Sequence, residues 1–538
     1  MRSSGTTTGG PRLRGTGRAK LWIFLSLSVS AYLVGFSLLL WNVLGRNGGH
    51  FEYAVDDAYI HMAVAKNYVL HGVFGITRYG FTSSLSSILW PWLLIGAFKV
   101  VGVSPFVPLG LNVAFSLLLI VLSFVLLPPE RATLLSLSLT FLGSTLSLTF
   151  VGLEHVLQIL ATLLVVVVGI SPPEGTKKRL AVLFVLSALA TATRYEGMAV
   201  AMAIALYRLL RRDIPGSVSV VLGGALPVLL YGLWSKAHGW YLLPTSVLTK
   251  AYRFNLHSPM GWVDLLGLKA LRTSLILPGL YSLWILLLLF LATPLGRREE
   301  RPLLLITLFV FTAHLYFGNV HWFYRYEAYI VSLALFSLIR ALDTSYLREI
   351  WERWDVVRRV SFGAAAFLLL STVVARGYMA VGYVPSAASE VYRQDYQMAL
   401  FVKEYYGDGP VVLNDVGNVA FYTDARIIDL WGLATLETAR MLLEGRYTQE
   451  NVDSLVREKG GRIAVLYGDV FAQRYFPVPW EEVGLWYLLG PRRFVVGNKT
   501  VYFYAVLEDP DTLRKHFTDF SGKRLPDGVY WEAINLGP

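Results

Sequence analysis

The sequence contains no cysteine in 538 residues. The protein therefore has no disulfide, no thiolate nucleophile and no cysteine ligand for a metal. Charge is also scarce, at 16% of residues, whereas soluble domains usually carry about 25%. Hydrophobic residues make up 55% of the chain and the mean hydropathy is +0.51. We therefore interpret the chain as a polytopic membrane protein.

The motifs of soluble nucleotide-binding and metal-dependent enzymes are missing as well. No GxGxxG follows a strand, and the sequence has no Walker motif, GxSxG elbow or HExxH pair. We therefore assign no metal to His61, His155, His238 or His321. The net charge of +11 comes from basic residues beside apolar runs, which indicates contact with anionic lipid rather than nucleic acid.

Apolar runs alternate with basic clusters through the first 380 residues. The runs are 21–44, 85–102, 106–127, 133–151, 155–170, 180–207, 217–234, 275–294, 303–320, 326–342 and 360–380. The basic tail before the first run and four basic clusters predict the cytoplasmic side by the positive-inside rule; the clusters are 177–179, 208–212, 297–301 and 340–359. This sidedness requires 85–102 to dip into the membrane and return. It also requires 180–207 to form two short helices with Arg194-Tyr195-Glu196 at the outer turn.

The domain organisation follows from the change in composition after residue 384. We predict a cytoplasmic tail at 1–20, a membrane domain of about 10–12 helices at 21–384, with a first outer loop at 45–84. Residues 385–538 read as an extracytoplasmic α/β domain. Its predicted strands are PVVLND, RIIDL, RIAVLYG and a hairpin in FVVGNKTVYFYAVLE that turns at Gly497-Asn498.

Two adjacent acids, Asp56 and Asp57, follow the first apolar run in FEYAVDDAYIHMAVAKNYVLHG. Since run 21–44 can cross a bilayer and follows a basic tail, both acids are expected at the outer membrane surface. One of them could simply cap the helix predicted over 58–71. A pair exceeds what a cap needs, and an acid here can deprotonate an acceptor hydroxyl. We predict Asp56 as the general base, with Asp57 close behind as an alternative base or cation ligand.

Further ionisable and aromatic residues are expected on the same outer side. They are Glu154, Arg194, Glu196, Lys250, Tyr252 and Arg325, which we predict to bind substrate. Lys250 and Arg325 are the preferred phosphate contacts. Four of these residues also have a structural interpretation. Glu154 could end a helix, Arg194 and Glu196 could form an ion pair that locks two helices, and Arg325 could lie at the membrane interface.

Several segments, in this order, resemble the GT-C superfamily of membrane glycosyltransferases that use polyprenyl-phosphate sugars. They are DDAYIHMAVAKN, VGLEHV, ATRYEG, WYLLPTSVLTKAY, FYRYEAY and VVLNDVGNVAFYTDARIIDLWGLA. The likeness covers most of the chain and is nearest to bacterial arabinofuranosyl- and mannosyltransferase-like members. The sequence departs from related ones at Tyr195, where proline is frequent, and at His155, where a small polar residue is usual.

The resemblance implies a catalytic acid at Asp56 or Asp57, a second-loop acid at Glu154, and phosphate contacts from Lys250 and Arg325. The implied reaction is an inverting transfer from a polyprenyl-phosphate sugar to a glycan, lipid or protein acceptor. It takes place in the cell membrane, where the N-terminus is cytoplasmic and the α/β domain lies outside. A divalent cation (Mg, Mn or Ca) held by Asp57 and Glu154 is an open possibility. The alternatives are a lipid or oligosaccharide transporter or flippase, and a non-catalytic membrane sensor.

Overall fold

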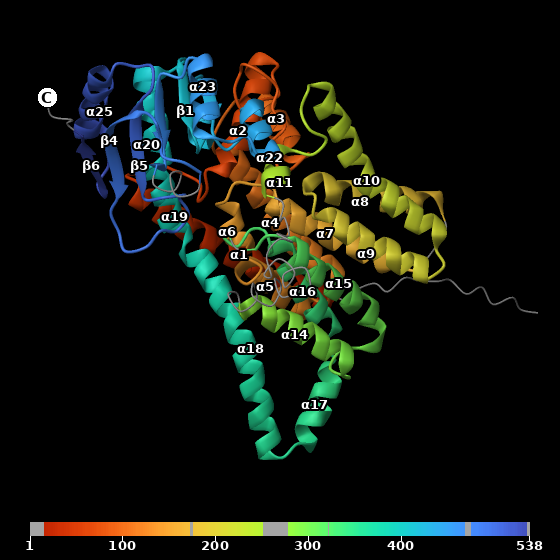
Figure 1. The fold of residues 1–538 in the computed structure, drawn as a ribbon. Coiled ribbons are helices and arrows are strands. Elements are labelled where there is room, and N and C mark those ends of the chain that lie inside the picture. Colours follow the sequence, from red (N-terminus) through yellow and green to blue (C-terminus); the bar gives the residue numbers. More distant parts are fainter. Residues whose placement is uncertain (1–14, 173–175, 251–277, 321, 469–474, 535–538) are drawn as a thin grey trace, which may run out of the picture.

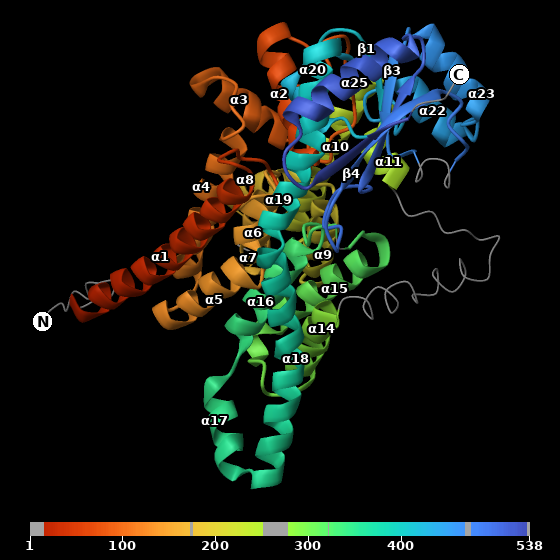
Figure 2. The same ribbon diagram turned by 90° about the vertical axis from the view of Figure 1, so that its left-hand side faces the viewer.

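A computed structural model describes residues 15–172, 176–250, 278–320, 322–468 and 475–534. Helices α1 to α18 form one body, and a sheet with its own helices lies at one end of it (Figure 1). Helix α17 and the adjoining end of α18 project from the opposite end, as the rotated view also shows (Figure 2). The chain therefore separates into a long helical part and a smaller α/β part.

The helical part begins with one long helix and continues through helices of very different lengths. They are α1 (Gly15–Arg46), α2 (Asp57–His71), α3 (Trp90–Val101), α4 (Val107–Leu126), α5 (Pro129–Phe141), α6 (Thr145–Thr149), α7 (His155–Ile170), α8 (Lys177–Thr193), α9 (Gly197–Leu210), α10 (Ile214–Ala237), α11 (Thr245–Lys250), α14 (Pro278–Ala292), the 3₁₀ helix η2 (Arg298–Glu300), α15 (Arg301–Phe317), α16 (Ala328–Ala341), α17 (Thr344–Arg353) and α18 (Val356–Gly382).

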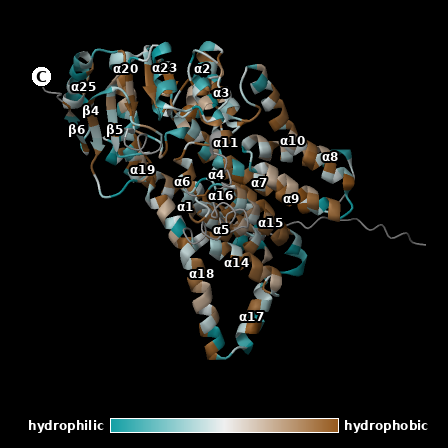
Figure 3. Cartoon of the chain, in the orientation of Figure 1, coloured by the Kyte–Doolittle hydropathy of each residue, from teal (hydrophilic) through white to brown (hydrophobic). Residues whose placement is uncertain are grey.

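Several of these helices have the length and composition of membrane spans. Among the described residues, five helical segments are long and apolar enough to cross a bilayer, and five shorter apolar helices accompany them. Figure 3 shows the apolar colour concentrated on α9, α14 and α15, whereas the sheet region is more polar. Many large apolar side chains on α1, α10 and α18 are exposed, as expected of helices that face lipid. The chain is a multi-pass membrane protein.

Two expectations about membrane segments can be compared with these helices. Run 180–207 does divide, because α8 ends at Thr193 and α9 begins at Gly197, with Arg194 extended between them. Run 85–102 contributes only the 12 residues of α3. That length is shorter than the roughly 20 residues that span a bilayer, and the dip of this segment into the membrane stays a prediction.

The α/β part contains one mixed sheet. Its described strands are β1 (Pro410–Leu413), β2 (Arg426–Asp429), β3 (Ile463–Leu466), β4 (Glu481–Leu488), β5 (Thr500–Ala505) and β6 (Val529–Ala533), in the order β2-β1-β3-β5-β4-β6. β1 is parallel to β2 and β3, and the remaining pairs are antiparallel. The accompanying helices are α19 (Val384–Arg393), α20 (Asp395–Tyr406), α21 (Gly417–Tyr422), α22 (Leu436–Glu444), α23 (Gln449–Glu458) and α25 (Pro510–Arg524).

The hairpin predicted around Gly497-Asn498 is wrong. β5 pairs instead with β4, which ends at residue 488, before a long connection. The Glu390 carboxylate accepts the backbone N–H groups of Phe494 (2.9 Å) and Val495 (2.8 Å). These donors are therefore not available to a strand ladder.

Helix α2 holds helix α21 of the α/β part at both ends. At the N-terminus of α21, Asp56 accepts hydrogen bonds from the backbone N–H groups of Gly417 and Asn418, each at 2.7 Å. At the C-terminus, the Lys66 ammonium donates to the carbonyls of Phe421 (2.9 Å) and Thr423 (2.8 Å). An acid at the N-terminus and a base at the C-terminus both match the helix dipole. We call this arrangement the α2–α21 clamp.

Candidate active site

Two cavities meet at the N-terminus of α2. The helix cavity, about 490 Å³, lies among membrane helices and includes His61, Arg194 and Arg325 in its wall. The interdomain cavity, about 1080 Å³, lies between the helical part and the sheet and includes Asp56 and Asp415. Asp57 lies in the wall of both cavities. It is therefore placed to contact ligands on either side.

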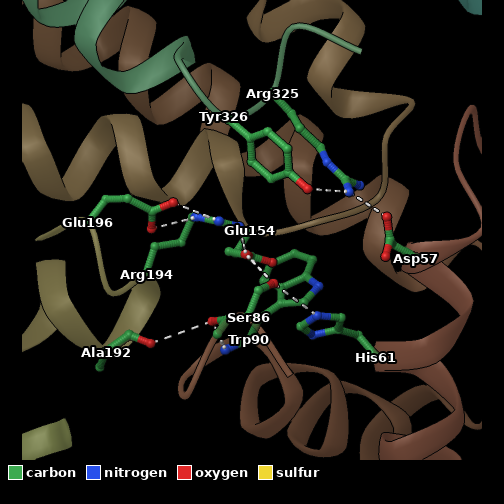
Figure 4. Close-up of polar contacts among 11 residues, drawn as sticks. Asp57, His61, Ser86, Trp90, Glu154, Ala192, Arg194, Glu196, Arg325 and Tyr326 are labelled. Carbon is green, nitrogen blue, oxygen red and sulfur yellow. Dashed lines mark hydrogen bonds and ion pairs between the residues drawn. The ribbon is translucent and has the colours of Figure 1, made fainter. Parts of the chain in front are cut away.

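Arg194 connects two acids in the helix cavity. Its guanidinium donates to Glu154 at 2.8 Å and forms a bidentate pair with Glu196 at 2.8 and 3.0 Å (Figure 4). Glu154 is fully buried and Arg194 is 6% exposed. Arg194 and Glu196 thus form the ion pair that the structural interpretation expects, and their binding of substrate stays a prediction. Glu154 occupies the N-cap position of α7, but its side chain makes no capping hydrogen bond.

Arg325 reaches the same cavity from the segment before α16. It forms an ion pair with Asp57 and donates to the Tyr326 hydroxyl at 3.3 Å. The ring of Tyr326 lies 5.0 Å from the Arg325 guanidinium carbon and 5.7 Å from that of Arg194, so it separates the two cations (Figure 4). Arg325 is 3% exposed, and its Nε and Nη1 atoms have no partner among the residues that the structure describes. These two donors are available to an anionic ligand.

The backbone before Arg325 has an unusual shape. Trp322, Phe323 and Tyr324 have φ angles of 42°, 63° and 57°, which is a left-handed run without glycine. Such a conformation costs of order 1–2 kcal/mol per residue and persists only when surrounding contacts hold it. Arg376 of α18 supplies such contacts, because it donates to the Tyr324 carbonyl (3.2 Å) and pairs with Glu327 (3.0 Å). The strained run therefore fixes the position of Arg325.

Unpaired polar atoms are concentrated around the helix cavity. Besides the two Arg325 nitrogens, buried atoms without a partner occur on His61, Ser84, Tyr195, Ser246 and His314, all of which line this cavity. A buried polar atom without a partner costs about 1–3 kcal/mol. Their concentration in one wall is therefore the pattern expected of a site that a polar ligand completes.

His61 connects the acids to the serine-rich segment before α3. Its Nε2 lies 3.5 Å from the Ser86 hydroxyl, and Ser86 in turn donates to Glu154 at 3.3 Å (Figure 4). Burial lowers the pKa of His61, and the nearby Glu154 carboxylate only partly opposes this. The imidazole is therefore expected to be neutral at pH 7, able to exchange a hydrogen bond but not to add positive charge.

The interdomain cavity has an acidic floor. Both Asp56 oxygens accept N–H groups from α21, and the amide Nδ2 of Asn418 adds a third bond at 2.9 Å. Asp415 follows β1 and hydrogen-bonds to Asp56; burial and the Asp56 charge raise its pKa well above the usual value. The Tyr467 hydroxyl lies 3.2 Å from Asp415 and 3.3 Å from Asp395. The Asp415–Asp56 bond is therefore best described as a protonated acid that donates to a carboxylate.

The structure brings together five of the predicted residues, Asp57, Glu154, Arg194, Glu196 and Arg325. Asp56 lies next to them but is engaged by α21. It occupies the N-cap position of α2 without making a side-chain capping bond there. Lys250 ends α11, but its side chain, like Tyr252 as a whole, lies outside the described residues.

Sequence reasoning missed the polar residues of the α/β part, above all Asp395, Asn414, Asp415 and Tyr467. The sequence did contain a pattern that could have identified two of them, Asn414 and Asp415. Asn414 and Asp415 directly follow strand β1, and the carboxyl ends of parallel strands are a frequent position for ligand contacts. Lys66 was missed too, because nothing local distinguishes it from an ordinary helix lysine.

The predicted divalent cation lacks an evident set of ligands. Asp57 pairs with Arg325, and Glu154 pairs with Arg194. In the described part of the chain, no group of three His, Asp or Glu side chains has a geometry that could hold a metal ion. The cation remains a prediction, which chelation can test.

Comparison with known proteins gives two findings. A family model described as a domain of unknown function (DUF8728) matches residues 387–504, within the α/β part. Among solved structures, the chain is similar to ArnT from Cupriavidus metallidurans bound to undecaprenyl phosphate. The TM-score is 0.51 at 12% identity, over 91% of this chain and 99% of that one. A search of curated proteins finds no match.

The similarity to ArnT extends over almost the whole length of both chains, so it concerns the entire architecture. At 12% identity it bears on the fold alone. The predicted fold class, a polytopic helical membrane protein with a C-terminal α/β domain, is confirmed. The chain shares the overall fold of ArnT.

Proposed function

We propose that this protein is a membrane glycosyltransferase that moves a sugar from a polyprenyl-phosphate donor to an acceptor hydroxyl. The observation that carries the proposal is the position of Asp57, which lies in the walls of both cavities and pairs with Arg325. A base between two binding spaces, beside a cation, is what transfer between two substrates requires. The overall fold, shared with a protein bound to undecaprenyl phosphate, supports the donor class.

The helix cavity is proposed to hold the donor phosphate and sugar. Arg325 offers Nε and Nη1 to phosphate oxygens, and the orphaned hydroxyl and imidazole atoms around it offer partners to sugar hydroxyls. Arg194 is a poorer phosphate ligand because two carboxylates already balance its charge. Its role in this proposal is to hold Glu154 and Glu196 in place.

Asp57, rather than Asp56, is the proposed general base. Both oxygens of Asp56 accept hydrogen bonds from α21, so they are poorly available to an acceptor proton. In the free protein, Asp57 is held by Arg325. A donor phosphate on Nε and Nη1 would share the charge of that guanidinium with Asp57, so donor binding is expected to weaken this ion pair. The base would then be more reactive when the donor is present.

The reaction proposed is a single displacement. The acceptor hydroxyl gives its proton to Asp57, and its oxygen forms a bond to the anomeric carbon. The bond from that carbon to the phosphate oxygen breaks, and the electron pair leaves with the polyprenyl phosphate, whose charge Arg325 stabilises. Because phosphate is an acidic leaving group, no general acid is needed, and one displacement inverts the anomeric centre. By sequence resemblance, arabinofuranose and mannose are the first sugars to test.

The test uses the purified chain in nanodiscs with a panel of labelled polyprenyl-phosphate sugars. Release of polyprenyl phosphate by the native protein, with loss in Asp57→Asn, is the expected result. Asp408→Asn is the matched control, because Asp408 is an exposed aspartate in the turn before β1. Absence of turnover with every donor, or equal rates in Asp57→Asn and the control, would contradict the proposal. Lipid flipping, the function of the main alternative class, would then be measured in the same nanodiscs.

A further inference from the structure

The interdomain cavity has polar groups that its own contacts do not satisfy. The Tyr467 hydroxyl lies within 3.3 Å of acceptor oxygens on Gln394, Asp395 and Asp415. A hydroxyl carries one proton, so Tyr467 can donate to only one of these three oxygens at a time. At least two of these three oxygens therefore receive no hydrogen bond from Tyr467 at any one time.

Asn414 adds an independent observation. This residue is 4% exposed and lines the cavity, and its Oδ1 accepts the backbone N–H of Tyr467 at 3.3 Å. Its amide Nδ2, a donor of two hydrogen bonds, has no partner within the described part of the chain. A buried amide nitrogen without a partner is costly. Acceptor oxygens beside an unused donor fit a ligand group that both donates and accepts, which is the property of a sugar hydroxyl.

The charges of the cavity wall indicate whether its ligand is neutral or anionic. Asp56 and Asp57 line this cavity, and an anionic ligand next to their carboxylates would be repelled. Two arginines, Arg492 and Arg493, also belong to its wall. Both are exposed, and Arg493 donates to the Gly497 carbonyl, so solvent screens their charge. The buried floor consequently favours a neutral ligand over a phosphorylated one.

Aromatic rings supply the remaining wall. Trp431 contacts Tyr475 edge to face, with 5.7 Å between ring centroids, and both line the cavity. Trp322 and Tyr324 line it from the left-handed run before α16. Large flat side chains with little conformational entropy suit the apolar C–H faces of sugar rings. The volume, about 1080 Å³, lies just above the usual range for small-molecule sites of about 300–1,000 Å³.

We propose that the interdomain cavity is the acceptor subsite and that the acceptor end it receives is an uncharged saccharide, held by Asn414, Asp415 and Tyr467. This inference rests on the proposed function, because it assigns the second substrate of the same reaction. A sugar hydroxyl on this floor faces Asp57 from the side opposite the helix cavity. The α/β domain, which supplies the three residues, thereby selects the acceptor.

The experiment measures transfer from an active polyprenyl-phosphate sugar to alkyl glycosides, using the full chain in nanodiscs. Neutral glycosides are compared with the same glycosides phosphorylated on a ring hydroxyl. Neutral acceptors are expected to have the lower KM, and Asn414→Ala and Asp415→Asn to raise it on the order of tenfold. Glu458→Gln, an exposed acid on α23, is the matched control. Polyprenyl phosphate affinity, measured in parallel, should not change in these variants, which also verifies folding.

Two results would overturn the assignment. One is a KM for neutral glycosides that stays within about twofold of native in both variants; the other is a preference for phosphorylated glycosides. If no donor turns over, the proposed function fails, and the cavity is then judged by binding alone. Saturable quenching of tryptophan fluorescence by a neutral glycoside, lost in Asn414→Ala, would support a saccharide site even then. Absence of quenching would reject it.

Discussion

The two cavities that meet at Asp57 balance their charges in different ways. In the helix cavity, buried arginines face carboxylates, and Arg325 keeps donors unused. In the interdomain cavity, acids are satisfied by backbone N–H groups, a tyrosine hydroxyl and a shared proton, and Asn414 keeps a donor unused. In our proposal the first arrangement pairs a cation with a ligand anion, whereas the second receives hydroxyl groups. Asp57 lies in the wall of both cavities, so the proposal lets one carboxylate serve two unlike substrates.

The largest expected effect separates the two neighbouring acids. Asp57→Asn should lower kcat by about 10²–10⁴, the usual contribution of a general base, with donor affinity retained. Asp56→Asn should lower kcat by less than about tenfold but reduce the melting temperature, because it weakens the α2–α21 clamp. Single-turnover rates and thermal unfolding of both variants measure this. The reverse pattern would make Asp56 the base.

Arg194→Met should chiefly affect stability. It leaves Glu154 buried without its cation, and breaking such a pair costs about 3–5 kcal/mol. Glu196→Gln should cost less, because the Glu196 side chain is 25% exposed and water replaces the lost contact. Unfolding monitored by protease resistance in nanodiscs would compare the two variants. Equal stability, together with a weakened donor affinity in Arg194→Met alone, would instead assign Arg194 to phosphate binding.

Arg325→Met should weaken donor binding by roughly 10–100-fold, because hydrogen bonds to charged groups contribute about 1.5–3 kcal/mol. The matched control is Arg348→Met on α17, whose side chain is 84% exposed at the far end of the helical part (Figure 1). Equilibrium binding of a fluorescent polyprenyl phosphate gives both dissociation constants. If Arg325→Met and Arg348→Met bind equally well, the helix cavity is not the phosphate site.

The pH should affect the stability of the folded protein through Asp415, which lines the interdomain cavity. Because its pKa is raised in the folded protein, the fold favours the protonated acid. The contribution of protonated Asp415 to the free energy of unfolding is fully present below the pKa of an unfolded aspartate, about 3.9. This contribution is lost as the pH rises through the pKa of Asp415 in the folded protein. The melting temperature of Asp415→Asn should therefore fall less than that of the native protein as pH increases from about 4. If the melting temperatures of the two proteins change with pH in the same way, Asp415 is not the group that causes the pH dependence.

The smallest effect is expected from metal removal. Arginines already occupy the positions beside Asp57 and Glu154, so chelation should lower the transfer rate by less than about twofold. Measurement of transfer with and without chelator, and after addition of Mg²⁺, Mn²⁺ or Ca²⁺, tests this directly. A large loss that one cation restores would show that a metal joins the site when substrate is bound.

Much of the helical part could be predicted from sequence, because lipid imposes simple rules on it. Apolar length and basic flanks gave the spans, and the charged triplet at 194–196 marked the break between α8 and α9. The ionisable residues of the helix cavity were found for the same reason, since an intramembrane charge is conspicuous.

The interdomain cavity could not be predicted, because aspartates and tyrosines are ordinary residues in an α/β domain. Only long-range packing distinguishes Asp415 from Asp408, which lies seven positions earlier on the surface. The wrong hairpin has a similar origin, because Glu390 is about a hundred residues from the segment whose N–H groups it binds. The engagement of Asp56 by α21 likewise depends on a contact that no local pattern contains.

The α2–α21 clamp has a consequence for the order of assembly. The ribosome makes Asp56 early, but its partner Gly417 follows 361 residues later. Until that late segment has been translated, Asp56 and Lys66 have no helix termini to bind, and the first turn of α2, which carries Asp57, lacks its support. A prematurely terminated chain would insert its helices yet leave the carboxylate unsupported. The proposed reactive centre would thus be complete only when synthesis is almost finished.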